Sequence, residues 1–145
     1  MMRILAVDPG EKHLGLAISD PTGTIASPLG VLKHVSRPVD AAAIAEMARQ
    51  HQVGRIVIGQ ALDADDRPTL QSRRAARLAA ALRLQTNLPV ELWDESGSTQ
   101  IARSARRALG VSRSRRSGHL DELAAVVILQ GYLEQIKGRK GLEDL

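Results

Sequence analysis

Three acidic positions, far apart in this sequence, could act together on a metal ion. Asp8 ends a short apolar stretch, and the pair Asp94-Glu95 ends another. Asp121 begins the most apolar helical stretch of the chain. Clustered carboxylates repel one another and are tolerated mainly where a cation joins them. Hard oxygen ligands suit Mg²⁺ or Mn²⁺, and such ions can activate water against a phosphodiester. The acids therefore predict a metal site with phosphodiester chemistry.

Each of these acids, taken alone, also fits a purely structural role. Asp8 could cap the Pro-Gly turn that follows it, and Asp121 could simply favour the positive end of its helix. Side chains alternate along a strand, so only one of Asp94 and Glu95 can share a site with Asp8. We expect two adjacent strands to present Asp8 and Glu95 at one edge. Small residues in the last helix would let it bring Asp121 there.

The elements that must position the acids follow from the hydrophobic pattern. It predicts strands at residues 3–8, 13–19, 24–33, 55–58 and 90–94, and helices at 38–52, 69–84, 98–109 and 119–135. Three consecutive strands read as an antiparallel meander, after which helices and strands alternate. This order predicts an α/β protein with a mixed five-stranded sheet flanked by helices. We expect one domain over residues 1–137 and a polar tail over 138–145.

Composition restricts the function classes. The chain has no cysteine, which excludes disulfides, thiolate zinc sites and a cysteine nucleophile. One Trp, one Tyr and no Phe argue against modules that stack bases on exposed rings. No stretch resembles a signal peptide or a membrane span, so we expect a cytoplasmic protein with no membrane partner. A net charge of +4 and a pI of about 10.1 favour a polyanionic partner.

Basic residues near the predicted acids could hold such a polyanion. Lys12 lies in the turn after Asp8, and an arginine-rich segment separates Glu95 from Asp121. We expect phosphate contacts from Lys12 and from three arginines of that segment, namely Arg113, Arg115 and Arg116. The alternative is that the arginines form a solvated face without a ligand.

Three stretches of the sequence carry a resemblance to a known family. They are ILAVDPGEKHLGLAISD at residues 4–20, VELWDESGST at 90–99 and DELAAVVILQGYL at 121–133. In order and spacing they resemble the YqgF family of bacterial Holliday-junction-resolvase-like proteins, also described as pre-16S rRNA nucleases. The resemblance implies a ribonuclease H-like fold, with Asp8, Glu95 and Asp121 as the acidic triad. It also implies a role in maturing the 5′ end of small-subunit ribosomal RNA.

The chain departs from the family pattern at two places. Ser96 stands where the family has an arginine after Asp-Glu, and Gly59-Gln60-Ala61 replaces Gly-Leu-Pro. An arginine beside the site would grip a phosphate with two hydrogen bonds, which a serine cannot do. Two alternatives to a pre-16S rRNA nuclease therefore stay open. One is an RNA-binding protein of the same fold with weakened catalysis, and the other is a Holliday-junction resolvase.

The expected partner is a nucleic acid, RNA in the first reading and branched DNA in the resolvase reading. A resolvase would need a dimer to cut two strands symmetrically. The sequence carries no clear dimer signal, and we expect a monomer or a weak homodimer.

Overall fold

The computed structural model describes residues 2–95 and 118–143 of the chain. The described elements, in chain order, are β1 (Arg3–Pro9), β2 (His13–Ser19), β3 (Ala26–Lys33), α1 (Arg37–Gln50), β4 (Val53–Gln60), α2 (Leu70–Arg83), β5 (Val90–Asp94) and α4 (Gly118–Glu143). The helix expected at 98–109 lies outside the described residues. No helix in the described part is long and apolar enough to span a membrane.

The strands form one mixed sheet in the order β3-β2-β1-β4-β5. β1, β2 and β3 pair antiparallel, whereas β4 pairs parallel with both β1 and β5. This confirms the predicted meander with two added parallel strands. Parallel pairing brings the carboxyl ends of β1, β4 and β5 to the same edge of the sheet, where ligands bind in folds of this kind.

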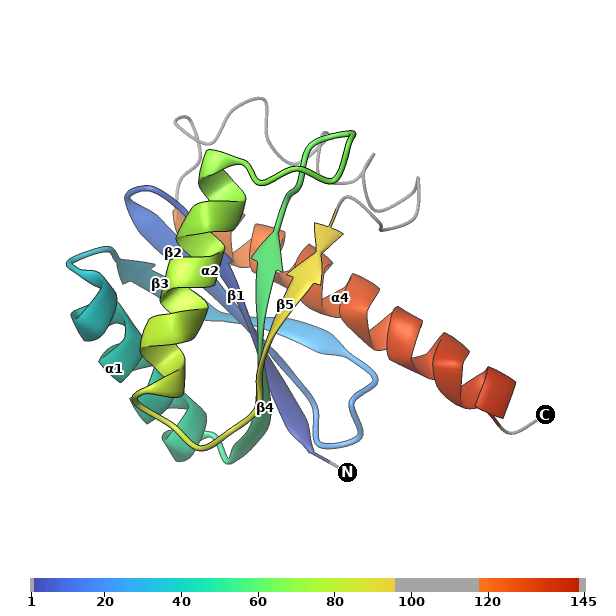
Figure 1. Cartoon of the computed structure of the whole chain (residues 1–145). Helices are drawn as coiled ribbons and strands as arrows, with labels where there is room; N and C mark the ends of the chain where they lie inside the picture. Colours follow the sequence, from blue (N-terminus) through green and yellow to red (C-terminus); the bar gives the residue numbers. More distant parts are fainter. Residues whose placement is uncertain (1, 96–117, 144–145) are drawn as a thin grey trace.

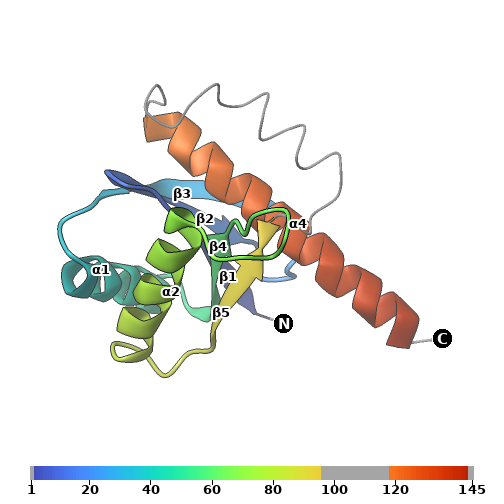
Figure 2. The ribbon, with the colours of Figure 1, turned by 45° about the horizontal axis from the view of Figure 1, so that its top comes forward.

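Helices cover both faces of the sheet (Figures 1 and 2). On one face, α1 and α2 pack on an aliphatic cluster built from the strand residues that point toward them, including Leu5, Val7 and Ile58. On the other face, α4 packs on a smaller cluster that includes Ala6, Ala17 and Val57. Burial of apolar surface on both faces, about 25 cal/mol per Å², holds the layers together.

Local signals explain where the helices begin. Ser36 caps α1 by accepting a hydrogen bond from the Val39 amide, and Thr69 and Ser72 form a reciprocal capping box at the start of α2. The helix boundaries lie within two residues of those predicted, except at the chain's end. There α4 continues to Glu143, so residues 138–143 of the expected polar tail are helical.

Candidate active site

Asp8 lies near the end of β1, on the face covered by α4. Alternation along β1 places it with Ile4 and Ala6, which belong to the cluster beneath α4. Its side chain is almost completely buried, with 2% of its surface exposed. A carboxylate in that setting needs hydrogen bonds or a cation to offset its desolvation.

Glu95 follows β5 directly and shares this face. Trp93 packs on the α4 side, so alternation along β5 turns Asp94 to the opposite face. Glu95 is 1% exposed. Its carboxylate lies over Gly59 of β4, because a Cβ added at Gly59 would come within 2.6 Å of Glu95 Oε1. The glutamate side chain therefore reaches across β4 in the direction of β1.

The prediction that Asp8 and Glu95 come from adjacent strands is wrong. β4 lies between β1 and β5, so the two backbones are separated by about two strand spacings, roughly 9–10 Å. The long Glu95 side chain spans part of that separation, because Gly59 has no side chain to block it. Sequence reasoning missed Gly59 as a site residue; a glycine at the end of a buried strand was the available signal, since it often marks close approach of another group.

Side chains from α2 hold the end of β4 in place. The Gln71 amide donates to the Gly59 carbonyl at 3.0 Å and accepts from the Ala61 amide at 2.6 Å. Thr69 Oγ1 donates to the Ala61 carbonyl at 2.6 Å. Two side chains at the start of α2 thus form hydrogen bonds with three backbone groups at the end of β4. A proline at position 61 would have no N–H for the bond to Gln71.

The last helix approaches the same edge of the sheet. The Ile128 side chain fills the space above Gly59, because a Cβ added at Gly59 would lie 2.6 Å from Ile128 Cδ1. Farther along α4, Tyr132 bonds to Arg55 and Glu91, which lie near the amino ends of β4 and β5. The helix therefore runs from the carboxyl edge toward the amino edge. Position 121, in its first turn, lies about 10 Å before Ile128 along the axis. The Asp121 side chain lies outside the described part.

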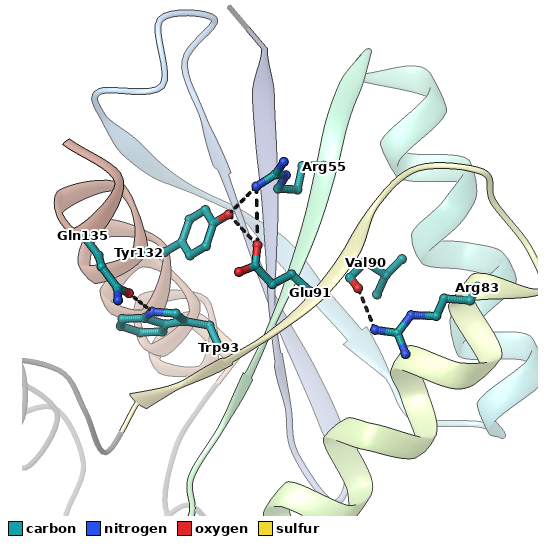
Figure 3. Close-up of polar contacts among 7 residues, drawn as sticks. All are labelled: Arg55, Arg83, Val90, Glu91, Trp93, Tyr132 and Gln135. Atoms are coloured by element: carbon teal, nitrogen blue, oxygen red, sulfur yellow. Dashed lines mark hydrogen bonds and ion pairs between the residues drawn. The ribbon is translucent and has the colours of Figure 1, made fainter. Parts of the chain in front are cut away.

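A polar cluster fixes α4 against the sheet (Figure 3). The Tyr132 hydroxyl donates to Glu91 Oε2 at 2.7 Å and accepts from Arg55 at 2.9 Å. Burial, followed by the bond to Glu91, raises the pKa of Tyr132 above its ordinary value. Beside it, Trp93 Nε1 donates to Gln135 Oε1, and the Trp93 ring meets Tyr132 edge to face. These contacts fix the position of the helix that carries Asp121.

The donor set at the strand ends fits a hard divalent cation. Two buried carboxylates on one face, one of them reaching over Gly59, offer the oxygen ligands that Mg²⁺ and Mn²⁺ prefer. Among side chains in the described part, no cluster of three such ligands occurs. Asp8 and Glu95 are thus a pair that would need a third group to complete the predicted triad.

The other predicted contacts are placed only in part. Lys12 lies in the exposed turn between β1 and β2, at the same edge as Asp8. Its backbone carbonyl accepts from the His34 amide, which ties this turn to the segment before α1. Arg113, Arg115, Arg116 and Ser96 lie outside the described residues.

Two solved Holliday junction resolvases have a similar arrangement of elements. RuvC of Thermus thermophilus, in complex with a Holliday junction substrate, matches with a TM-score of 0.57 at 17% identity, over 95% of this chain and 97% of that one. The fowlpox virus Holliday junction resolvase matches with a TM-score of 0.51 at 16% identity, over 92% and 99%. The fold is therefore the ribonuclease H-like one, as the sequence predicts.

Curated relatives match by sequence over almost the whole chain. A protein of Anaeromyxobacter sp. strain Fw109-5, named "Putative pre-16S rRNA nuclease", is 41% identical over 92% of this chain and 97% of its own length. A protein of the same name from Pelotomaculum thermopropionicum is 40% identical over 92% of this chain and 87% of its own length. The family profile RuvX, described as Holliday junction resolvase, matches residues 2–135. This chain therefore belongs to the RuvX family, in agreement with its resemblance to the YqgF proteins.

Proposed function

We propose that this protein hydrolyses phosphodiester bonds of nucleic acid with Mg²⁺ or Mn²⁺, as a nuclease that matures the 5′ end of pre-16S ribosomal RNA. The observation that carries the proposal is the buried pair of Asp8 and Glu95 on one face at the strand ends. The names of the curated relatives support the substrate. This role places the protein in ribosome biogenesis in the cytoplasm.

Asp8, Glu95 and Asp121 are the proposed ligands. A bound divalent ion would supply a more acidic water and a counter-charge for the phosphate. The protein's own part is to hold the carboxylates at a fixed separation: Gly59 leaves the space, Gln71 fixes the strand end, and α4 covers the pair. Lys12 and the segment with Arg113, Arg115 and Arg116 are the proposed phosphate contacts.

The proposal is tested by cleavage of an RNA with the pre-16S 5′ leader, in Mn²⁺ and in EDTA. Asp8→Asn should lower the cleavage rate at least about 100-fold, because it weakens the ligand set that activates water. Asp94→Asn is the matched control: this acid lies beside Glu95, but alternation along β5 places it on the opposite face from Trp93, and we expect nearly full activity. Equal rates for Asp8→Asn and wild type, or full activity in EDTA, would contradict the proposal.

The same cleavage assay, extended to a four-way DNA junction and to RNA binding, distinguishes two alternative functions. The solved resolvases with this fold favour branched DNA as a second candidate substrate. Symmetric cleavage of a four-way junction, with no cleavage of the leader RNA, would favour that candidate. Ser96, in place of the family's arginine, favours a protein that binds RNA but cleaves it weakly. RNA binding without any metal-dependent cleavage would select that reading.

A further inference from the structure

A pocket lies on the opposite face of the sheet from the carboxylate pair, at the same edge. It is lined by the β1–β2 turn, by the segment that leads into α1 and by one turn of α2. The polar side chains in its lining are Glu11, His34, Arg37, Asp40 and Arg74. Because the turn begins after Pro9, and so two residues beyond Asp8, a strand of nucleic acid held at Asp8 would pass close to the mouth of this pocket.

Two arginines in this pocket have hydrogen-bonding capacity to spare. Arg37, at the start of α1, has its Nε fully buried and without a hydrogen-bond partner in the described part of the chain. Arg74 comes from the middle of α2 and is half-buried. Neither arginine pairs with a carboxylate among the described residues. A buried guanidinium N–H without a partner is costly, and an anion that the Arg37 side chain shifts to meet would offset that cost.

The acidic residues that line the pocket form no ion pair with these arginines among the described residues. Asp40 accepts from the Val35 amide at 3.0 Å through one oxygen and pairs with His34 Nδ1 at 2.5 Å through the other. Both of its oxygens therefore already have partners on the segment that leads into α1. Glu11 lies on the exposed turn, where solvent screens its charge. Arg37 and Arg74 therefore line the pocket without a carboxylate partner among the described residues.

We propose that Arg37 and Arg74 bind one backbone phosphate of the nucleic-acid strand whose scissile bond lies at Asp8 and Glu95. Guanidinium groups suit this ligand because their planar N–H groups bond two phosphate oxygens at once. The proposal rests on the proposed function for the identity of the strand. It adds a second anchoring point, on the α1–α2 face, which would fix the strand's direction across the sheet edge.

Binding of a short single-stranded RNA in EDTA, over a range of salt concentrations, tests this subsite without cleavage. The double variant Arg37→Gln/Arg74→Gln should bind about 10-fold more weakly, with a log–log salt slope smaller by about 0.7, the value for one phosphate contact on a single strand. Arg73→Gln/Arg77→Gln is the matched control, since it removes the same charge from exposed positions of α2. We expect its affinity to stay within about 3-fold of wild type.

Inorganic phosphate serves as the probe that distinguishes a free phosphate ion from a backbone phosphate of RNA as the ligand of this pocket. It should raise the melting temperature of wild type and of the control by mass action, but not that of Arg37→Gln/Arg74→Gln. If both double variants bind RNA equally, the proposal is overturned. If phosphate stabilises the protein but the RNA affinity does not depend on Arg37 and Arg74, the pocket takes a free phosphate and the strand assignment is wrong.

Two further comparisons keep the result clear. Should the glutamine variant fail to fold, Arg37→Lys/Arg74→Lys keeps the charge and loses the bidentate bonds, and weaker RNA binding is again expected. Failure of the proposed function is a different outcome, because it is measured as cleavage by Asp8→Asn. Loss of RNA binding in the arginine variant, beside normal cleavage by Asp8→Asn, would keep this subsite and reject the metal site.

Discussion

The smallest residue of the candidate site sets its dimensions. Gly59 occupies the strand between those that carry Asp8 and Glu95, and both the Glu95 carboxylate and Ile128 of α4 use the space above it. Any side chain at this position would compete with the glutamate and with the helix. The residue has no chemistry of its own, yet the separation of the two carboxylates depends on it.

Gly59→Ala should therefore damage both stability and metal binding. The new Cβ would lie 2.6 Å from Glu95 Oε1 and also 2.6 Å from Ile128 Cδ1, so both side chains must move. We expect a loss of about 1–3 kcal/mol in the free energy of unfolding, as for overpacked cores. The stabilisation that Mn²⁺ gives to wild type should also shrink. Thermal melting with and without Mn²⁺ measures both effects.

Gly30 supplies the control for this change. It is also a strand glycine, in β3, but a Cβ added there would meet nothing within 4 Å. Gly30→Ala should leave the melting temperature and the Mn²⁺ response close to wild type. A similar loss in both variants would mean that the effect belongs to strand glycines in general and not to the carboxylate pair.

The individual acids could be predicted from the sequence, but their arrangement could not. A carboxylate directly after an apolar strand is visible locally, which is why Asp8 and Glu95 could be singled out. That Gly59 lies between the two acids could not be predicted, because the position of β4 between β1 and β5 depends on the strand order. Strand order depends on how the crossing helices pack, which no local pattern encodes.

Among the elements, α4 matters most for the candidate site, because it covers the carboxylate pair and carries Asp121. Its buried face includes Ala125, Ile128 and Tyr132, and its first turn carries Asp121. The cluster of Tyr132, Glu91 and Arg55 is where polar bonds attach this helix to β4 and β5. The state of that cluster can be read directly, because Tyr132 is the only tyrosine of the chain.

Spectroscopic titration of tyrosine should show a pKa above the ordinary value of 10.0. Burial and the bond to Glu91 favour the neutral phenol of the folded protein. The sign for stability follows: the contribution is fully present below about pH 10 and is lost as the pH rises through the raised pKa. Chemical denaturation at increasing alkaline pH should show this loss in wild type, and Tyr132→Phe should lack it.

Variants of the two partners should move this pKa in opposite directions. Glu91→Gln removes a negative charge beside the phenol and should lower the midpoint toward the ordinary value, whereas Arg55→Gln removes a positive charge and should raise it further. A wild-type midpoint near that of free tyrosine, insensitive to both substitutions, would mean that the cluster does not hold α4 in solution.

The element boundaries were largely predictable because caps and apolar periods are local. The apolar period that follows Thr69, and the short strand pattern that ends at Asp94, gave boundaries within a residue of those observed. The end of α4 was not predictable in this way. Gly138, directly after Lys137, is a typical stop signal, yet α4 continues past it to Glu143. The polarity of these last turns also suits a solvated tail.

For the whole molecule, charge should decide how strongly it binds its polyanion. The net charge is +4, and arginines concentrate between Glu95 and Asp121. Replacing Arg113, Arg115 and Arg116 by Ala should weaken RNA binding and reduce the log–log salt slope by at most about one unit per lost phosphate contact. Binding isotherms at several salt concentrations measure this.

A charge-matched triple variant shows whether the position of these arginines matters. Arg49 on α1, and Arg73 and Arg77 on α2, are exposed, and replacing them by Ala removes the same total charge. The control should change RNA affinity much less. Equal slopes for the two triple variants would assign the binding to net charge alone and leave the segment with Arg113 as a solvated face.

Convergence of the three acids can be tested through the stability of the whole protein, without the right substrate. If Asp121 joins Asp8 and Glu95, the metal-free protein holds three like charges together, so Asp121→Asn should leave the melting temperature in EDTA unchanged or raise it. Wild type should gain stability in millimolar Mg²⁺ or Mn²⁺, because an ion that binds only the folded state shifts the equilibrium toward it. The variant should gain much less.

Glu122→Gln is the control that separates this outcome from a simple helix effect. It removes one negative charge from the same turn of α4, one position along the helix. If Asp121 only favours the positive end of the helix, its loss should cost about 0.3–1 kcal/mol in EDTA and metal should make no difference to either protein. If the site forms, Glu122→Gln should keep the full metal response while Asp121→Asn loses it. A lower melting temperature of Asp121→Asn in EDTA, together with no response of wild type to metal, would remove Asp121 from the site and leave Asp8 and Glu95 without the third ligand that the proposed chemistry requires.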